Sequence, residues 1–224
     1  MLRRIAILAV LGLVAAGCSG NATKSSTPPA PPASTSAGQP SACPTVTAPK
    51  SRSENRKAPT SGLDASKTWT ARVETSCGSF TIRLDVEDSP HTTASFVSLA
   101  RSGFYDDTTF HRIVPGFVIQ GGDPTATGGG GPGYSVVDRP PSTATYPRGA
   151  VAMAKTPTEP AGTSGSQFFV VTGDASFLTP DYALLGTVVK GMRVAEKIGT
   201  LGQHSEAGTP TQVVVIRRIT ISST

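Results

Sequence analysis

Short apolar segments separated by glycine and proline dominate the second half of the chain and restrict the folds open to it. The segments at 112–119, 151–154, 167–172 and 183–189 are short for helices, and 24 Gly and 19 Pro occur among the 224 residues. Glycine and proline interrupt regular elements and favour turns. Many short strands joined by glycine-rich loops, together with two helices, predict a closed barrel.

The segment before these runs predicts a hairpin and a helix. Residues 68–85, "TWTARVETSCGSFTIRLD", alternate apolar and polar side chains on both sides of a short turn. A helix is expected next, because Ser89 can cap it and Pro90 suits its first position. A second, shorter helix and a closing strand are predicted at 192–198 and 213–221.

The first residues are typical of an export signal. Arg3 and Arg4 precede an apolar stretch at 5–14, which is too short to span a bilayer comfortably and has the length of a signal-peptide core. The residues "AAGC" that end at Cys18 resemble a bacterial lipobox, in which the cysteine becomes the first mature residue and carries lipid. This resemblance implies a lipoprotein signal peptide at 1–17. It also implies anchoring to the cell membrane through lipid on Cys18, facing the extracytoplasmic side. The alternative is an ordinary signal peptide cleaved nearby, with Cys18 incidental.

Residues 18–66 are predicted to form a disordered tether ahead of a folded domain at 67–224. From position 19 to 49 the chain is mainly Ser, Thr, Pro, Ala and Gly, with Val46 as its only large aliphatic residue. Such a segment cannot bury enough apolar surface to offset the entropy lost on ordering.

Two cysteines remain after Cys18, and the sequence leaves their state open. Cys43 lies in the predicted tether and Cys77 in the predicted hairpin turn. Disulfides persist in exported proteins, so a bridge between the two would attach the tether to the domain. Two unpaired thiols are the alternative.

Charge and histidine spacing argue against two classes of partner. The formal net charge is only +5, and two of the positive residues lie in the expected signal peptide. No concentrated basic face is evident, so nucleic acid is not an expected partner. His91, His111 and His204 lack the spacing of metal ligands, so no metal site is expected. Nothing in the sequence indicates an oligomer, and a monomer is expected.

Two motifs carry a family resemblance. Residues 104–123, "FYDDTTFHRIVPGFVIQGGD", and 164–173, "SGSQFFVVTG", resemble the cyclophilins, which are peptidyl-prolyl cis-trans isomerases. "GGPGY" at 130–134 and "FLTPDYALLG" at 177–186 also fit the family pattern. The resemblance extends over about residues 68–223. It implies a mainly β fold, a closed eight-stranded antiparallel barrel capped by two helices.

The implied reaction needs little chemical machinery. Rotation about a peptide bond faces a barrier of about 18–20 kcal/mol, and the isomers of an Xaa-Pro bond are nearly balanced but exchange over tens to hundreds of seconds. A catalyst requires an apolar pocket for the proline ring and a donor aimed at the imide nitrogen, which becomes a better acceptor as the bond twists. No nucleophile, metal or cofactor is required.

By resemblance, Arg112 is this donor, and Gln120 holds Arg112 and binds the substrate backbone. The proline pocket is expected to be lined by Phe117, Val118, Phe169 and Leu178. Gln167 and the backbone of Ala154 and Lys155 are expected to bind the residues that precede the proline. Taken singly, the apolar residues could be core, and Arg112 could instead pair with an acid such as Asp123. His111 is interpreted as a packed, hydrogen-bonded residue.

Four positions depart from the family pattern. Phe177 replaces a tryptophan of the best-known members, so the indole N–H donor is missing and weaker cyclosporin binding with retained activity is predicted. Val118 replaces a methionine, Tyr182 a histidine and Lys155 an asparagine. We therefore expect a membrane-tethered isomerase, with an altered pocket, that acts on Xaa-Pro segments of exported proteins. A proline-peptide-binding or interaction lipoprotein with little turnover is the alternative.

Overall fold

The computed structural model describes residues 42–224. The predicted signal peptide, Cys18 and the predicted tether up to residue 41 lie outside the described residues. Within 42–224, no helix combines the length and the apolar character needed to cross a membrane.

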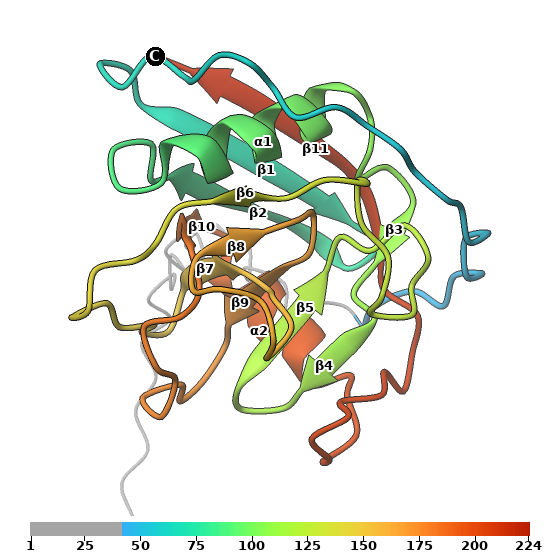
Figure 1. Cartoon of the computed structure of the whole chain (residues 1–224). Helices are drawn as coiled ribbons and strands as arrows, with labels where there is room; N and C mark the ends of the chain where they lie inside the picture. Colours follow the sequence, from blue (N-terminus) through green and yellow to red (C-terminus); the bar gives the residue numbers. More distant parts are fainter. Residues whose placement is uncertain (1–41) are drawn as a thin grey trace, which may run out of the picture. The chain divides into compact units, whose positions relative to one another are not determined.

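A single antiparallel sheet of nine strands curls around the core (Figure 1). Its order is β3-β11-β1-β2-β10-β7-β9-β5-β4, and a separate pair, β6 and β8, lies outside it. The bounds of the main-sheet strands are β1 (Trp69–Thr75), β2 (Gly78–Leu84), β3 (Thr108–Thr109), β4 (Arg112–Val114), β5 (Val118–Gly121), β7 (Ala150–Met153), β9 (Phe168–Val171), β10 (Leu184–Lys190) and β11 (Val215–Ser223). Those of the pair are β6 (Val136–Val137) and β8 (Thr163–Ser164).

The mainly β prediction with two helices is confirmed, although the sheet has nine strands instead of eight. The additional strand arises because β3 and β4, at the two ends of the strand order, are separated only by Phe110 and His111. One interrupted segment therefore supplies both edges, and the chain itself joins them. An isolated bridge pairs Thr109 of β3 with Asp123, just past the end of β5. Among the described strands, β3 and β4 do not pair with each other, so the sheet is a strongly curled half-barrel and not the closed barrel expected from sequence.

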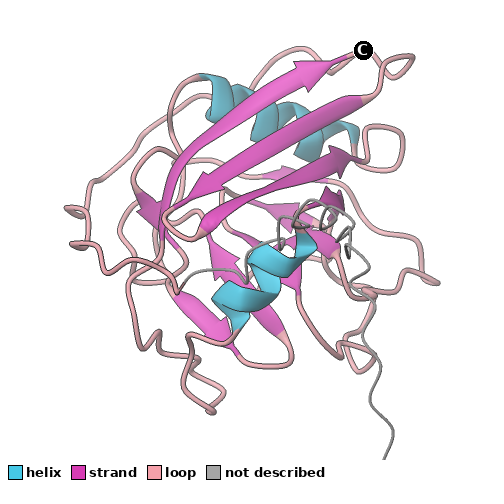
Figure 2. Cartoon of the chain, turned by 180° about the vertical axis from the view of Figure 1, so that it is seen from behind, coloured by secondary structure: helices cyan, strands magenta, loops and turns pink. Residues whose placement is uncertain are grey.

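Two helices pack at opposite ends of the curled sheet (Figure 2). They are α1 (Pro90–Arg101) and α2 (Met192–Gly199). The predicted cap Ser89 occupies the right position, but its side chain makes no capping hydrogen bond. The carboxylate of Asp138 instead accepts the backbone N–H of Thr92 at 2.6 Å, which satisfies one of the free donors at the helix start.

An aromatic cluster forms part of the core beneath α1. The ring of Phe96 lies 5.0 Å from that of Tyr105 and 5.8 Å from that of Phe168, centre to centre. All three side chains are essentially inaccessible to solvent. Because aromatic rings contribute large buried areas and favourable edge-to-face contacts, this cluster fixes α1 and the start of β9 to each other.

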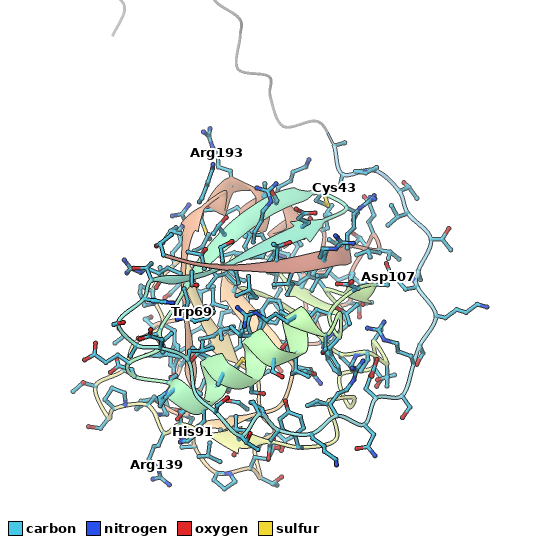
Figure 3. The ribbon with its side chains drawn as sticks, turned by 90° about the horizontal axis from the view of Figure 1, so that it is seen from above. Cys43, Trp69, His91, Asp107, Arg139 and Arg193 are labelled. Carbon is cyan, nitrogen blue, oxygen red and sulfur yellow. A yellow bond between two sulfur atoms is a disulfide. The ribbon has the colours of Figure 1, made fainter. Side chains whose placement is uncertain are left out.

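Residues 42–66, named here the N-terminal strap, contain no helix or strand but are attached to the domain. Cys43 forms a disulfide with Cys77 in the β1–β2 turn, with their Cα atoms 4.7 Å apart. Figure 3 shows the segment leaving Cys43 and passing the side of the domain that carries Asp107. The prediction of a disordered tether up to residue 66 therefore does not describe this part. The strap has too little apolar surface to order itself, but the disulfide and polar contacts hold it against the domain.

Candidate active site

A tight hairpin between β4 and β5 explains the spacing of Arg112 and Gln120. The turn between the strands includes Gly116, whose φ of +73° lies in the left-handed region that favours glycine. The register then places Arg112 directly opposite Gln120, and Gln120 opposite Phe169 of β9. Opposed residues on antiparallel strands project to the same face, so the three side chains form one row across three strands.

The same strands separate two apolar layers. Ile113, Ile119 and Val170 project into the barrel core, whereas Val118 and Phe169 belong to a second buried cluster on the outer face. Alternation along each strand produces this division. The outer cluster forms the base on which the candidate site is built.

A pocket of about 480 Å³ opens over this outer cluster, and we name it the apolar pocket. It is lined by Arg112, Phe117, Val118, Gln120, Ala154, Lys155, Pro157, Phe169, Phe177, Leu178 and Tyr182. Every residue predicted for catalysis or substrate binding, except Gln167, is among them. Gln167 lines a neighbouring cavity of about 390 Å³, the side groove, which shares Gln120, Ala154 and Lys155 with the apolar pocket.

Arg112 is held from one side by a backbone carbonyl. Its Nε and Nη2 donate to the oxygen of Glu206 at 3.2 and 3.1 Å, and its guanidinium carbon lies 6.0 Å from the ring centre of Phe117. Burial lowers the pKa of Arg112, an effect opposed by Tyr182 and Glu206. Arginine nevertheless stays protonated in proteins, so the apolar pocket contains a cation with several N–H donors.

Asp123 does not pair with Arg112, contrary to the alternative considered from sequence. Its buried carboxylate accepts backbone N–H groups, from Thr125 at 2.7 Å and from Gly128 at 2.6 Å among others. Burial opposes ionisation, but these hydrogen bonds lower the pKa of Asp123. Asp123 therefore fixes the fold of the segment at 123–134, which we name the glycine loop.

Gln120 contacts a different partner from the one predicted. Its Nε2 donates to Oε1 of Gln167 at 3.0 Å. Gln167 in turn donates to the carbonyl oxygens of Gly128 and Gly130, at 2.8 and 2.9 Å. The predicted contact in which Gln120 directly holds Arg112 is not what the structure shows. The two residues are opposed across β4 and β5, but the amide of Gln120 bonds Gln167 instead. The reason is that Gln167 lies within reach of Gln120 while Glu206 occupies the guanidinium.

Aromatic side chains form the walls of the apolar pocket. The ring of Tyr182 meets that of Phe169 edge to face, 5.4 Å between centres. The hydroxyl of Tyr146 donates to the carbonyl of Tyr182 at 2.8 Å and accepts its N–H at 2.9 Å. Sequence reasoning missed Tyr146, since only the fold shows that it fixes Tyr182 from a loop 36 residues away.

The mouth of the apolar pocket carries an exposed aromatic pair. Phe117 and Phe177 lie 4.9 Å apart, centre to centre, and Phe177 is 66% exposed. A core role is therefore ruled out for Phe177. Val118 and Phe169, by contrast, are 2% and 5% exposed and serve as both core and pocket base.

His111 is packed, but the hydrogen bonds predicted for it are missing. Both ring nitrogens are buried, and neither has a hydrogen-bond partner within residues 42–224. Burial lowers the pKa of His111 despite the opposing effect of Asp123, which favours the neutral ring. In the described part of the chain, no three His, Cys, Asp or Glu side chains gather as metal ligands.

Comparisons with known proteins agree with this geometry. A family profile described as cyclophilin type peptidyl-prolyl cis-trans isomerase/CLD matches residues 70–221. Peptidyl-prolyl cis-trans isomerase A of Mycobacterium tuberculosis is 38% identical over 173 residues, covering 69% of this chain and 93% of the relative. Peptidyl-prolyl cis-trans isomerase-like 1 of Aspergillus fumigatus is 37% identical over 148 residues, covering 64% and 90%.

Solved structures are similar as well. A crystal structure of a Cryptosporidium parvum cyclophilin type peptidyl-prolyl cis-trans isomerase superposes with a TM-score of 0.63 at 29% identity, covering 70% of this chain and 99% of that one. A second structure of that name, determined in the presence of the dipeptide Ala-Pro, also has a TM-score of 0.63, at 31% identity. It covers 69% of this chain and 99% of that one.

Proposed function

This chain belongs to the cyclophilin-type peptidyl-prolyl cis-trans isomerases, and we propose that it applies this activity to exported proteins at a membrane surface. Two observations support the location. Residues 1–17 and Cys18 have the pattern of a lipoprotein signal. The disulfide between Cys43 and Cys77 is of a kind that persists outside the reducing cytoplasm.

The arginine in the apolar pocket carries the proposed mechanism. A proline ring enters over Phe169 and Val118, because burying its methylene groups is favourable. The guanidinium of Arg112 then faces the imide nitrogen. As the peptide bond twists, the nitrogen lone pair is released from the carbonyl and accepts a hydrogen bond. The contact is stronger in the twisted state than in either planar state, so it lowers the barrier.

The placement of Arg112 strengthens this contact. The Glu206 carbonyl engages Nε and one N–H of Nη2, and the remaining N–H groups of the planar fork are available to the substrate. Partial burial reduces competition from water, which strengthens a charge-assisted hydrogen bond. No proton transfer or covalent step takes part.

Xaa-Pro segments of polypeptides are the proposed substrates. The side groove extends the apolar pocket past Gln120 and Ala154 toward Gln167. We assign it to the residues that precede the proline, which the backbone of Ala154 and Lys155 would bind. The Cryptosporidium relative determined with Ala-Pro is consistent with a dipeptide as the minimal unit.

The activity is tested with the full-length chain and its Arg112→Ala variant, by following cis-to-trans isomerisation of a short Xaa-Pro peptide. We expect acceleration by the wild type and near-complete loss in a folded variant. If both proteins bind proline peptides and neither accelerates the reaction, the protein is a binding lipoprotein instead.

The location is tested separately by feeding the producing cells labelled palmitate. The wild type should incorporate label and enter the membrane fraction, and Cys18→Ala should do neither. Labelled protein in the Cys18→Ala variant, or unlabelled wild type in the soluble fraction, would contradict the proposed anchor.

A further inference from the structure

The N-terminal strap has one side turned to the domain. Arg52, Glu54 and Arg56 are half-buried, whereas the residues between them, Ser53 and Asn55, are exposed. Alternation of this kind is typical of an extended segment that lies on a surface. The three half-buried residues are charged, so the contact is polar rather than apolar.

Backbone hydrogen bonds join this side of the strap to both ends of the glycine loop. The N–H of Arg52 donates to the carbonyl of Pro124 at 3.0 Å, and the N–H of Arg56 donates to that of Pro132 at 2.7 Å. Between them, Asn55 lies against Gly133, where an added Cβ would come within 2.9 Å of the Asn55 Oδ1. The loop and the strap are therefore in close contact.

Glu54 keeps the strap in this conformation. Its two carboxylate oxygens accept from Nε of Arg52 at 2.8 Å and from Nε of Arg56 at 2.9 Å, and its side chain is only 12% exposed. Burial raises the pKa of Glu54, but the hydrogen bonds from the two arginines outweigh it and lower the pKa. Arg52 also donates to the carbonyl of Phe104. This bond attaches the Arg52–Glu54–Arg56 group to the chain that follows α1.

The glycine loop also forms part of the candidate site. Residues 128–134 line the side groove, and Gln167 hydrogen-bonds the carbonyls of Gly128 and Gly130. A loop this rich in glycine has high conformational freedom. Asp123 orders part of this loop from within, and the strap adds contacts at Pro124, Pro132 and Gly133.

We propose that residues 52–56 of the strap are positioning residues for substrate. They hold the glycine loop so that the side groove fits the residues preceding the proline, and the disulfide at Cys43 anchors their segment. This inference rests on the isomerase activity. It assigns a role to a part of the chain that precedes the family match at 70–221. Pre-ordering a binding loop improves affinity because less freedom is lost on binding.

The test compares two peptides on the full-length protein. One has a single residue before the proline, and the other has four, all uncharged. The variant is Glu54→Gln, which preserves shape and removes the charge held by Arg52 and Arg56. The matched control is Lys57→Gln, an exposed charge removal in the same segment. Circular dichroism and thermal melting confirm that each protein is folded.

We expect Glu54→Gln to raise KM for the long peptide roughly three- to tenfold, with kcat within about twofold. KM for the short peptide and all constants of Lys57→Gln should stay at wild-type values. Equal changes for both peptides, or none for either, would overturn the positioning role. Absence of turnover on the short peptide by the wild type would instead refute the isomerase activity, so the two failures are distinguishable.

Discussion

The side-chain amide of Gln120 is hydrogen-bonded to that of Gln167, Nε2 to Oε1, at 3.0 Å. Gln120 lies on β5 in the row that begins at Arg112, and Gln167 immediately precedes β9. One residue lines both cavities and the other lines the side groove alone. This bond therefore joins the site of chemistry to the site proposed to hold the preceding residues.

The two glutamines should act as a unit in catalysis. Gln120→Ala and Gln167→Ala are each expected to lower kcat/KM, because each removes the hydrogen bond between the two amides. The double variant should lose less than the product of the two single losses, with a coupling of about 1 kcal/mol, or roughly fivefold. Kinetics of all four proteins on one peptide measure this coupling. Independent, multiplicative effects would show that the bond has no role in turnover.

Replacement of Arg112 should affect turnover more than folding. Loss of a donor to a developing acceptor typically lowers the rate by about 10²–10³, and we expect this in kcat/KM for Arg112→Ala. Arg112→Lys should restore little of the lost kcat/KM. A lysine ammonium lacks the planar array of N–H groups by which the guanidinium bonds Glu206 and the substrate at the same time. Arg193→Ala, which removes an arginine that projects from α2 (Figure 3), is the control. Wild-type activity in Arg112→Lys would reject the geometric requirement.

Much of the barrel was predictable because local signals determine it. The hairpin at β1–β2 follows from alternation on both sides of the turn at Ser76 and Cys77, which leads into Gly78 with a φ of +123°. Helix α1 begins at the predicted Pro90. The row from Arg112 to Gln120 required the turn geometry and not only the count of residues, since the register depends on where the hairpin reverses.

The remaining features depend on contacts between distant parts of the chain. Nothing local in the strap indicates that the N–H of Arg52 reaches Pro124 or that the N–H of Arg56 reaches Pro132. In the same way, the role of Tyr146 becomes visible only when Tyr182 is placed beside it. Composition indicates only how much apolar surface a segment could bury. The strap and the loop at Tyr146 are held by hydrogen bonds and, in the strap, a disulfide, which composition does not reveal.

Acid should weaken the contact between the strap and the glycine loop. A carboxylate whose pKa is lowered by folding stabilises the protein above its unfolded value, about 4.3 for Glu, and this contribution is lost as pH falls through the lower folded pKa. Glu54 and Asp123 both have lowered pKa values. Wild type should therefore be more stable than Glu54→Gln at pH 7, by about 1 kcal/mol or less, and the difference should shrink as pH falls below about 4.3.

Thermal melting of both proteins across pH 3–7 measures this difference. Asp85 and Asp106 have pKa values raised by burial, so they act in the opposite sense, but they are present in both proteins and cancel. A difference that stays constant from pH 7 to pH 3 would show that the charge of Glu54 is not its source.

Phe177 should limit the affinity for cyclosporin. A phenylalanine supplies the apolar ring at the pocket mouth but has no N–H donor, and its ring is mostly exposed. Phe177→Trp is expected to tighten cyclosporin inhibition about tenfold, as a new hydrogen bond is worth about 1 kcal/mol and the larger ring adds buried area. Isomerase activity without the drug should remain. Inhibition curves for the two proteins measure this gain in affinity. A gain that is several-fold or smaller would contradict the prediction.

Reduction of the disulfide between Cys43 and Cys77 should lower stability. The bridge closes a loop across a sequence separation of 34 residues, and restricting the unfolded chain to this extent contributes about 3–4 kcal/mol in the chain-entropy treatment. For a domain of this size the melting temperature should fall by about 6–16 °C on reduction. Cys43→Ser should melt at the temperature of the reduced wild type and should not respond to reductant. A melting temperature of the wild type that reductant leaves unchanged, with thiol titration confirming that both sulfurs are free, would show that the bridge does not stabilise the fold.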